Sequence, residues 1–355
     1  YAPVGSHEDL LPYLVRRLLE NGANTSFVNR IVDESIDVTD IVADPLAATA
    51  EQDFKPHPRI PAPADLFAPQ RRNSRGINLP EPVVQTELLV RLEEMASRSW
   101  SAQPVVGGKR LDGNEVLSVN PANGDDVVGI CQLATAEHVD AALDLAAASQ
   151  LRWDLTPAGQ RAAILEKAAD LFEDNETELL SLCIREAGKT IPDAISELRE
   201  AVDFLRYYAA ETRRQFGAPT ELPGPTGERN TIGLRGRGVF VCISPWNFPL
   251  AIYTGLMSAA LAAGNSVLVK PAEQTPLVAF RAFELMLEAG VPADVLHFLP
   301  GDGPTVGGRA VADPRVAGVA FTGSTETARI INTTLAERPG PIASFIAETG
   351  GQNAM

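Results

Sequence analysis

The sequence predicts an α/β fold whose second half is a doubly wound, Rossmann-type parallel sheet. Short apolar runs alternate with longer helical patterns between residues 238 and 346, and each run ends at a turn that contains Pro or Gly. Repeated units of strand, crossover helix and strand place parallel strands in one sheet with helices on both faces. The predicted strands cover residues 238–243, 266–269, 295–299, 316–321 and 342–346.

The chain begins with a strongly marked helix over residues 6–22. Ser6 is a candidate N-cap, leucines recur at helical spacing, and Gly22 is a stop signal. The apolar face of so short a helix needs a partner from elsewhere. Arg16 and Arg17 interrupt this face, and solvated arginine side chains are an alternative interpretation of both.

A Pro-rich segment over residues 44–84 follows. Its prolines oppose long regular structure and favour an extended linker, although a disordered tail is the alternative. Turn signals within residues 103–131 then predict hairpins. Helices that contribute to the core are predicted over residues 85–99, 135–149 and 156–175, in a stretch that ends before Gly188, and over residues 192–215.

Polar side chains follow the ends of two neighbouring predicted strands. Asn247 comes after the first of them, and Lys270 and Glu273 come after the second. Ligands of doubly wound sheets bind at the carboxyl ends of the strands, which makes these residues candidates for a site. An Asn and a Lys in solvated turns are the alternative interpretation.

A second binding signal is the pair Gly323-Ser324, which lies between a predicted strand and a predicted helix. Backbone N–H groups and the helix dipole at such a position suit a pyrophosphate group. The Gly-Asp-Gly turn that ends at Gly303 is a weaker signal of the same kind.

Composition excludes several classes of function. The net charge of −16 and the pI near 4.7 oppose a nucleic-acid surface, because phosphate contacts need clustered Lys and Arg. No apolar run predicts a transmembrane helix, and the first residues do not resemble a signal peptide. The four histidines lack ligand spacing, so we expect no metal site. Three scattered cysteines favour a reducing compartment, and we expect a cytoplasmic protein.

Two motifs in the second half resemble those of the aldehyde dehydrogenase superfamily: Pro-Trp-Asn-Phe-Pro from residue 245 and Val-Lys-Pro-Ala-Glu from residue 269. The Asn-Pro-Ala-Asn-Gly turn from residue 120 is a further shared feature. The resemblance implies an aldehyde dehydrogenase-like sheet that binds NAD. It implies that Asn247 donates its amide to a thiohemiacetal oxyanion and that Glu348 is the general base for thioester hydrolysis. It also assigns to the cofactor site Ser244, Pro245, Trp246, Lys270, Glu273, Gly303, Phe321, Thr322, Gly323 and Ser324.

Two of these assignments carry chemical expectations. Lys270 and Glu273 would hold the adenosine ribose, and the Glu273 carboxylate would repel a 2′-phosphate, which favours NAD over NADP. Glu348 would act as a base if partial burial lifted its pKa toward neutral. Thr349 and Gln352 depart from the usual Glu-Leu-Gly-Gly-Lys pattern of the superfamily but match its proline utilization A version.

The resemblance places the nucleophilic cysteine of the family beyond Met355, so we expect an incomplete sheet and domain. Cys242 is a poor substitute, because its neighbours are apolar and a thiol among them stays protonated. Cys131 and Cys183 are no better placed.

Residues 1–28 resemble the last helix of the proline dehydrogenase (β/α)8 barrel in the bifunctional proline utilization A family. In that family the residues that match Tyr1, Arg16 and Arg17 enclose proline, and the two guanidinium groups pair with its carboxylate. The rest of the barrel, with its FAD, would belong to the parent protein outside this sequence.

The resemblance divides the chain into the end of the proline dehydrogenase barrel (residues 1–43), the linker (44–84) and the first part of an aldehyde dehydrogenase domain (85–355), with the NAD-binding sheet mainly in residues 231–355. The parent would oxidise proline and then L-glutamate γ-semialdehyde, as a cytoplasmic homo-oligomer. Peripheral association of the parent with a membrane is left open.

Two other functions are open at this point. The polypeptide could bind NAD without catalysis, as a regulatory or scaffold module. It could also be a monofunctional aldehyde dehydrogenase with an unrelated helical extension, which the match over residues 1–28 disfavours.

Overall fold

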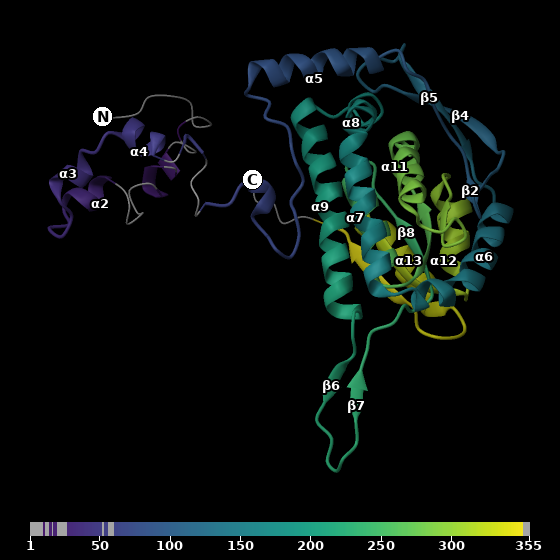
Figure 1. The fold of residues 1–355 in the computed structure, drawn as a ribbon. Coiled ribbons are helices and arrows are strands. Elements are labelled where there is room, and N and C mark those ends of the chain that lie inside the picture. Colours follow the sequence, from purple (N-terminus) through teal and green to yellow (C-terminus); the bar gives the residue numbers. More distant parts are fainter. Residues whose placement is uncertain are drawn as a thin grey trace. The chain divides into compact units, whose positions relative to one another are not determined.

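The computed structural model describes residues 10, 14–15, 17–19, 27–51, 53–55 and 60–350. The chain divides into two compact units, Tyr1–Ala62 and Pro63–Met355. Figure 1 shows the course of the chain through each of them.

The first unit contains three short helices among its described residues, two of which begin at aspartates. The carboxylate of Asp37 accepts the N–H of Thr39 at 2.8 Å, and that of Asp44 accepts the N–H of Leu46 at 2.9 Å. Both carboxylates therefore satisfy backbone donors that a helix start leaves unpaired. The helices are α2 (Phe27–Ile31), α3 (Val38–Ile41) and α4 (Pro45–Ala50).

The predicted N-terminal helix is described only in part. Leu14 and Leu18 are helical, and their exposed fractions are 44% and 73%. Their exposure fits the expectation that this apolar face needs a partner from elsewhere. Ser6 and Gly22, the predicted ends of the helix, lie outside the described residues.

The second unit is built on a seven-stranded sheet with the order β12-β11-β8-β9-β10-β2-β3. The five strands from β12 to β10 are parallel, which confirms the predicted doubly wound sheet, while β2 and β3 add an antiparallel edge. The sequence predicted that hairpin but not its place in this sheet, because strands of two residues carry no readable pattern. The strands are β2 (Val105–Val106), β3 (Lys109–Arg110), β8 (Val239–Ile243), β9 (Ser266–Lys270), β10 (Leu296–Phe298), β11 (Val316–Thr322) and β12 (Ser344–Glu348).

Helices cover both faces of this sheet, as the alternation of side chains along β8 shows. Val239 and Val241 belong to a core shared with α6, α12 and α13, whereas Phe240 and Cys242 belong to a core shared with α7 to α11. Successive residues of a strand point to opposite faces, so both faces are buried and every β8 residue from 239 to 242 is apolar. The helices are α6 (Ala136–Leu155), α7 (Ala158–Asp174), α8 (Glu176–Arg185), α9 (Ile191–Phe216), α10 (Ala251–Ala262), α11 (Pro276–Ala289), α12 (Arg309–Ala312) and α13 (Thr325–Glu337).

Two predicted helices have different limits in the structure. Helix α5 (Pro82–Met95) begins three residues before residue 85, because a proline is tolerated in the first turn of a helix. Helix α6 continues past the predicted end at Ser149, whose hydroxyl donates to the carbonyls of Ala146 and Asp294. A smaller sheet of order β1-β5-β4 comprises β1 (Trp100–Ala102), β4 (Asn114–Val119) and β5 (Val127–Leu133), of which β4 and β5 form a predicted hairpin.

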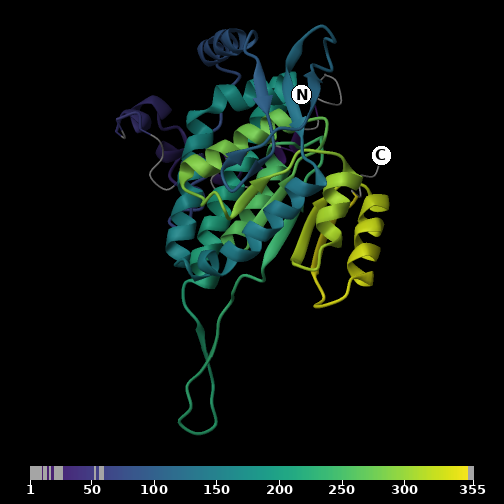
Figure 2. The same cartoon turned by 90° about the vertical axis from the view of Figure 1, so that its right-hand side faces the viewer.

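A two-stranded ribbon was not predicted. Strands β6 (Thr220–Leu222) and β7 (Asn230–Ile232) pair antiparallel, and in both views the ribbon projects from the body of the second unit (Figure 1, Figure 2). All six residues are exposed, so no alternation of apolar and polar residues marks these strands.

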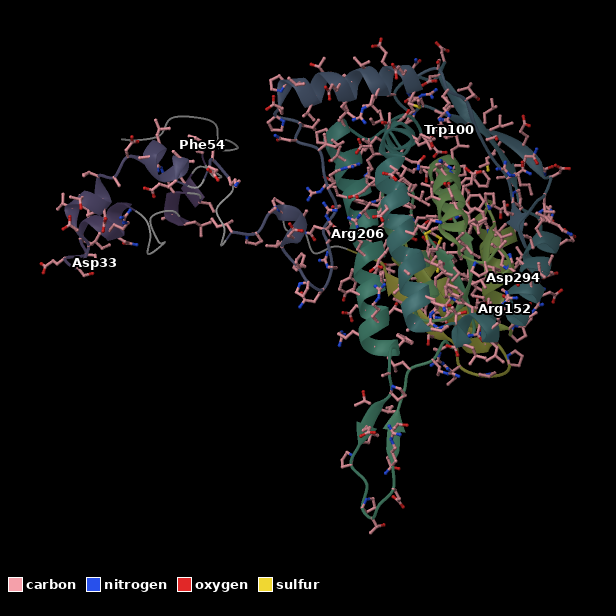
Figure 3. All side chains as sticks on the ribbon, in the orientation of Figure 1. Asp33, Phe54, Trp100, Arg152, Arg206 and Asp294 are labelled. Atoms are coloured by element: carbon pink, nitrogen blue, oxygen red, sulfur yellow. The ribbon has the colours of Figure 1, made fainter. Side chains whose placement is uncertain are left out.

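The second half of the Pro-rich segment packs on α9. The N–H of Ser74 donates to Asp203 at 2.7 Å, and the guanidinium of Arg206 donates to the carbonyl of Asn73 at 3.0 Å. Arg206, labelled in Figure 3, also pairs with two carboxylates of α7. The second unit therefore begins at Pro63, inside the segment that the sequence predicted as a linker. Its first element is the short 3₁₀-helix η1 (Pro63–Asp65).

Candidate active site

A cavity of about 1040 Å³ lies at the carboxyl ends of β8, β9, β11 and β12. Parallel strands end at the same edge of a sheet, so loops that are far apart in the sequence meet there. The residues that line this cavity include all twelve that the sequence analysis assigned to catalysis or to the cofactor: Ser244, Pro245, Trp246, Asn247, Lys270, Glu273, Gly303, Phe321, Thr322, Gly323, Ser324 and Glu348.

The turn after β8 presents Asn247 to the cavity. The N–H of Ser244 donates to the carbonyl of Lys270 at 3.2 Å, which ties the ends of β8 and β9 together. Trp246 is 59% exposed, and Asn247 beside it is exposed as well. The Asn247 amide is thus available to a bound molecule.

Ser244 differs from its neighbours because it is buried. Ser244 lines the cavity, and its buried hydroxyl oxygen has no hydrogen-bond partner among the described residues. A buried hydroxyl without a partner is costly, so a ligand group or a water at this place would be stabilised.

The turn after β9 carries a buried ammonium group beside a carboxylate. Lys270 is 6% exposed, and its Nζ lies 3.8 Å from Oε1 of Glu273 and donates to the carbonyl of Pro271 at 3.1 Å. Burial lowers the pKa of Lys270, while the carboxylates of Glu273 and Asp302 act in the opposite direction.

The turn after β11 forms the start of α13. The Ser324 hydroxyl accepts the N–H of Thr327 at 3.1 Å and caps the helix. A Cβ atom at position 323 would lie 2.6 Å from the ring of Phe321, so a side chain here would force the ring or the turn to shift. Backbone N–H groups at this helix start face a region suited to anions.

Glu348 ends β12 at the rim of the cavity. Its carbonyl accepts the N–H of Gly323 at 3.2 Å, and the hydroxyl of Thr325 donates to the carbonyl of Thr349 at 3.0 Å. These bonds hold β12 against the turn after β11. Among the described residues the Glu348 side chain is exposed at the end of β12, and its assignment as the general base stays a prediction.

Several lining residues were missed by the sequence analysis. Four of them, at positions 327, 330, 331 and 334, form one face of α13, and their spacing at three and four residues could have indicated it. Gly307 and Gly308 lie in a π-helix, η2 (Gly303–Gly308), which no sequence pattern predicts.

None of the three cysteines lines this cavity, and all three are buried. Burial raises the pKa of Cys242 to about 12, and burial together with the charge of Glu186 raises that of Cys131 to about 12. The pKa of Cys183 also lies well above its usual range. The prediction that Cys242 stays protonated is confirmed.

The remaining predicted residues belong to the first unit. Tyr1 and Arg16 lie outside the described residues, and Arg17 is helical and exposed. Their assignment to proline binding stays a prediction. Within the described part of the chain, no group of three acidic, His or Cys side chains suits a metal ion, and no helix is long and apolar enough to cross a bilayer.

Comparisons with known proteins agree with this geometry. The aldehyde dehydrogenase family matches residues 110–355, and the proline dehydrogenase family matches residues 1–30. The bifunctional protein PutA of Salmonella typhimurium is 50% identical over 364 residues, which cover 100% of this chain and 27% of PutA. The expected resemblance to the proline utilization A family is thereby confirmed, over 27% of that relative's length.

Two solved structures extend the comparison. A variant of proline utilization A from Bradyrhizobium japonicum is 49% identical with a TM-score of 0.80, over 99% of this chain and 32% of that one. The 1-pyrroline-5-carboxylate dehydrogenase from Thermus, solved with bound NAD, is 34% identical with a TM-score of 0.73, over 79% of this chain and 55% of that one. From residue 110 onward, the chain belongs to the aldehyde dehydrogenase family.

Proposed function

We propose that this chain forms the NAD-binding part of an L-glutamate γ-semialdehyde dehydrogenase in a protein that also oxidises proline. One observation carries the proposal: the ends of three parallel strands, β8, β9 and β12, bring Asn247, Lys270, Glu273 and Glu348 to one cavity. The similarity to PutA over the whole chain supports this substrate class, and the Thermus relative solved with NAD supports the cofactor.

The residues of the cavity fit the parts of NAD. The start of α13 at Ser324 suits the pyrophosphate, and Lys270 with Glu273 suits the ribose hydroxyls. The unpartnered hydroxyl of Ser244 offers a further hydrogen bond. Apolar side chains of α12 and α13, at Val311 and Ile330, line the same cavity and suit an adenine ring.

The side chains of this unit would serve two steps of aldehyde oxidation. Attack of a thiolate on an aldehyde places negative charge on the former carbonyl oxygen, and the exposed amide of Asn247 can donate a hydrogen bond to it. NAD, held by the residues named above, would supply the hydride acceptor for this oxidation. The Glu348 carboxylate can then take a proton from the water that hydrolyses the thioester.

The attacking thiolate must come from another part of the protein. Cys131, Cys183 and Cys242 are buried outside the cavity, and their thiols are held protonated at neutral pH. This placement agrees with the family resemblance, which assigns the nucleophile to a residue after Glu348.

The match of residues 1–30 to the proline dehydrogenase family supports the second activity. We infer that the complete protein oxidises proline to pyrroline-5-carboxylate with FAD, and that Tyr1, Arg16 and Arg17 contact that substrate. Hydrolysis of pyrroline-5-carboxylate gives the semialdehyde that the second activity consumes. Assembly of several copies in the cytoplasm belongs to the same proposal.

The experiment that tests this function uses the complete gene product. NADH formation is followed with L-glutamate γ-semialdehyde as substrate, and separately with proline as substrate. We expect NADH to form in both assays. With proline as substrate, NADH should form only when the protein has both the proline-oxidising and the semialdehyde-oxidising activity. If the complete gene product formed no NADH with either substrate, the proposal would be contradicted.

A further inference from the structure

A buried carboxylate caps the helix that follows the Asn247 turn. Oε2 of Glu197 accepts the N–H groups of Leu250 and Ala251 at 3.0 and 3.1 Å, and Glu197 is 1% exposed. These N–H groups belong to the start of α10, where a helix leaves donors unpaired. The position of Glu197 therefore fixes the point at which the turn over residues 246–249 ends.

A lysine connects this carboxylate to the turn itself. Nζ of Lys189 lies 2.9 Å from Oε1 of Glu197, as an ion pair rather than a hydrogen bond, and 4.1 Å from the centre of the Phe248 ring. A cation over an aromatic face is attracted to it, more strongly where water is excluded. Phe248 is the neighbour of Asn247, so Lys189 restrains the turn beside the amide.

A second buried carboxylate caps the helix that follows the Glu273 loop. Glu186 accepts the N–H groups of Leu277 and Val278, each at 2.8 Å, and the hydroxyl of Ser118 at 3.1 Å. Leu277 and Val278 are in the first turn of α11, directly after the loop. Glu186 and Glu273 also line one small cavity of about 310 Å³.

Both capping carboxylates lie close together in the sequence, Glu186 directly after α8 and Glu197 in the second turn of α9. Gly188 allows the chain to turn there, because its φ of +66° is unfavourable for other residues and a Cβ atom would lie 2.9 Å from Pro121. Residues 186–197 thus reach the starts of α10 and α11 at the same time. We name residues Glu186, Lys189 and Glu197 the α8–α9 bracket.

We propose that the α8–α9 bracket positions the loops after β8 and β9 separately. Lys189 and Glu197 fix the loop that carries Asn247, and Glu186 fixes the loop that carries Glu273. This proposal rests on the proposed function for what Asn247 and Glu273 do. Because Asn247 would act on the oxyanion and Glu273 on the cofactor, the two arms of the bracket affect different kinetic constants.

Steady-state kinetics of the complete enzyme test this division. We expect Lys189→Met and Glu197→Ala to lower kcat by about ten-fold or more and to leave the KM for NAD within about two-fold, because a small displacement of a catalytic group is costly. We expect Glu186→Ala to raise the KM for NAD by about ten-fold and to change kcat less. Lys189→Arg should restore kcat, because it keeps a cation beside Phe248 and Glu197.

Two exposed residues provide matched controls. Lys109→Met, in β3, and Glu115→Ala, in β4, make the same substitutions at exposed positions outside the bracket. We expect both to behave as wild type. If all three bracket variants changed kcat and KM in parallel, the division into two arms would be overturned.

A readout that needs no catalysis separates this inference from the proposed function. Fluorine NMR of the fluorotryptophan-labelled complete enzyme reports on Trp246 in the turn, with the resonance assigned by Trp246→Phe. We expect Lys189→Met and Glu197→Ala to shift this resonance, Glu186→Ala to leave it in place, and the buried Trp153 resonance to show that each variant is folded. An unshifted Trp246 resonance in folded Lys189→Met and Glu197→Ala would overturn the bracket, even in an enzyme that oxidises the semialdehyde. A shifted resonance in an enzyme without NAD-dependent activity would support the bracket and contradict the proposed function.

Discussion

At the scale of single residues, Asn247 links the fold to the proposed chemistry. Its backbone belongs to a turn between a buried strand and a buried helix, whereas its side chain is exposed at the cavity. A donor held by rigid elements on both sides needs little rearrangement when charge develops on a substrate oxygen.

Replacement of this amide tests its role. In the complete enzyme, we expect Asn247→Ala to lower kcat by about 10² to 10³, the usual effect of losing one oxyanion donor, with little change in NAD affinity. Stopped NADH assays and an NAD titration measure the two effects. Asn114→Ala, an exposed change in β4, is the control. A kcat within about two-fold of wild type would remove Asn247 from the mechanism.

His297 provides a second prediction, on stability. It is fully buried, its Nδ1 accepts the N–H of Gly107 at 3.1 Å, and burial lowers its pKa to about 4. Unfolded chains take up this proton near pH 6.5, so the unfolded state binds more protons between about pH 6.5 and about pH 4. The free energy of unfolding should therefore fall in this window as the pH is lowered, by up to about 3 kcal/mol from this group.

Urea denaturation of the wild type and of His297→Asn at about pH 7 and about pH 5 measures this contribution. The variant should show a smaller loss of stability on acidification. The wild type and the variant must be compared because Glu186 has the opposite effect on stability. Burial raises the pKa of Glu186 to about 7, so the folded state binds its proton more tightly than the unfolded state does. The contribution of Glu186 to the free energy of unfolding therefore falls as the pH rises from 4.5 to about 7. Equal losses in both proteins would contradict the role of His297.

At the scale of elements, helix α10 contains a buried hydroxyl that could be removed at no cost. Tyr253 is 1% exposed, and its hydroxyl has no hydrogen-bond partner among the described residues. We expect Tyr253→Phe to leave the protein as stable as wild type or to stabilise it by about 1 kcal/mol, because the variant buries no unpaired polar group. Thermal unfolding measures the change. A loss of more than about 1 kcal/mol would mean that the hydroxyl is bonded.

The turn before α13 yields a prediction on binding. Because a Cβ atom at Gly323 would lie 2.6 Å from the Phe321 ring, Gly323→Ala should displace the N–H groups at the helix start. We expect NAD to bind at least about ten-fold more weakly to this variant, since in the proposed site the pyrophosphate would be bound by that backbone. Gly227→Ala, in an open loop, is a control for loss of stability alone. Unchanged affinity in Gly323→Ala would place the pyrophosphate elsewhere.

At the scale of the whole molecule, the parallel sheet and the meeting of its loops could be predicted from the sequence. Strands buried on both faces read as continuous apolar runs, and the rule that ligands bind at strand ends then brought Asn247, Lys270 and Glu273 together. The loop that follows Glu348 was assigned to the site only because its motif resembles that of the family. The position of a residue relative to the end of a predicted strand thus indicated at which edge of the sheet the residue lies.

Other features depend on distance across the fold and leave no local pattern. The contacts of Glu186 with α11 and of Glu197 with α10 join residues more than fifty positions apart. In the sequence both glutamates look like ordinary helix residues. The β6–β7 ribbon has no buried face, and so it lacks the period that marks a strand.

The central claim is that the cavity at the strand ends binds NAD, with Glu273 at the adenosine ribose. Calorimetric titration of NAD and of NADP into this chain tests it most directly. The account predicts that NAD binds, that NADP binds at least about ten-fold more weakly because Glu273 repels its 2′-phosphate, and that Glu273→Gln narrows this difference. An absence of NAD binding at millimolar concentration, or equal affinity for both dinucleotides, would contradict it.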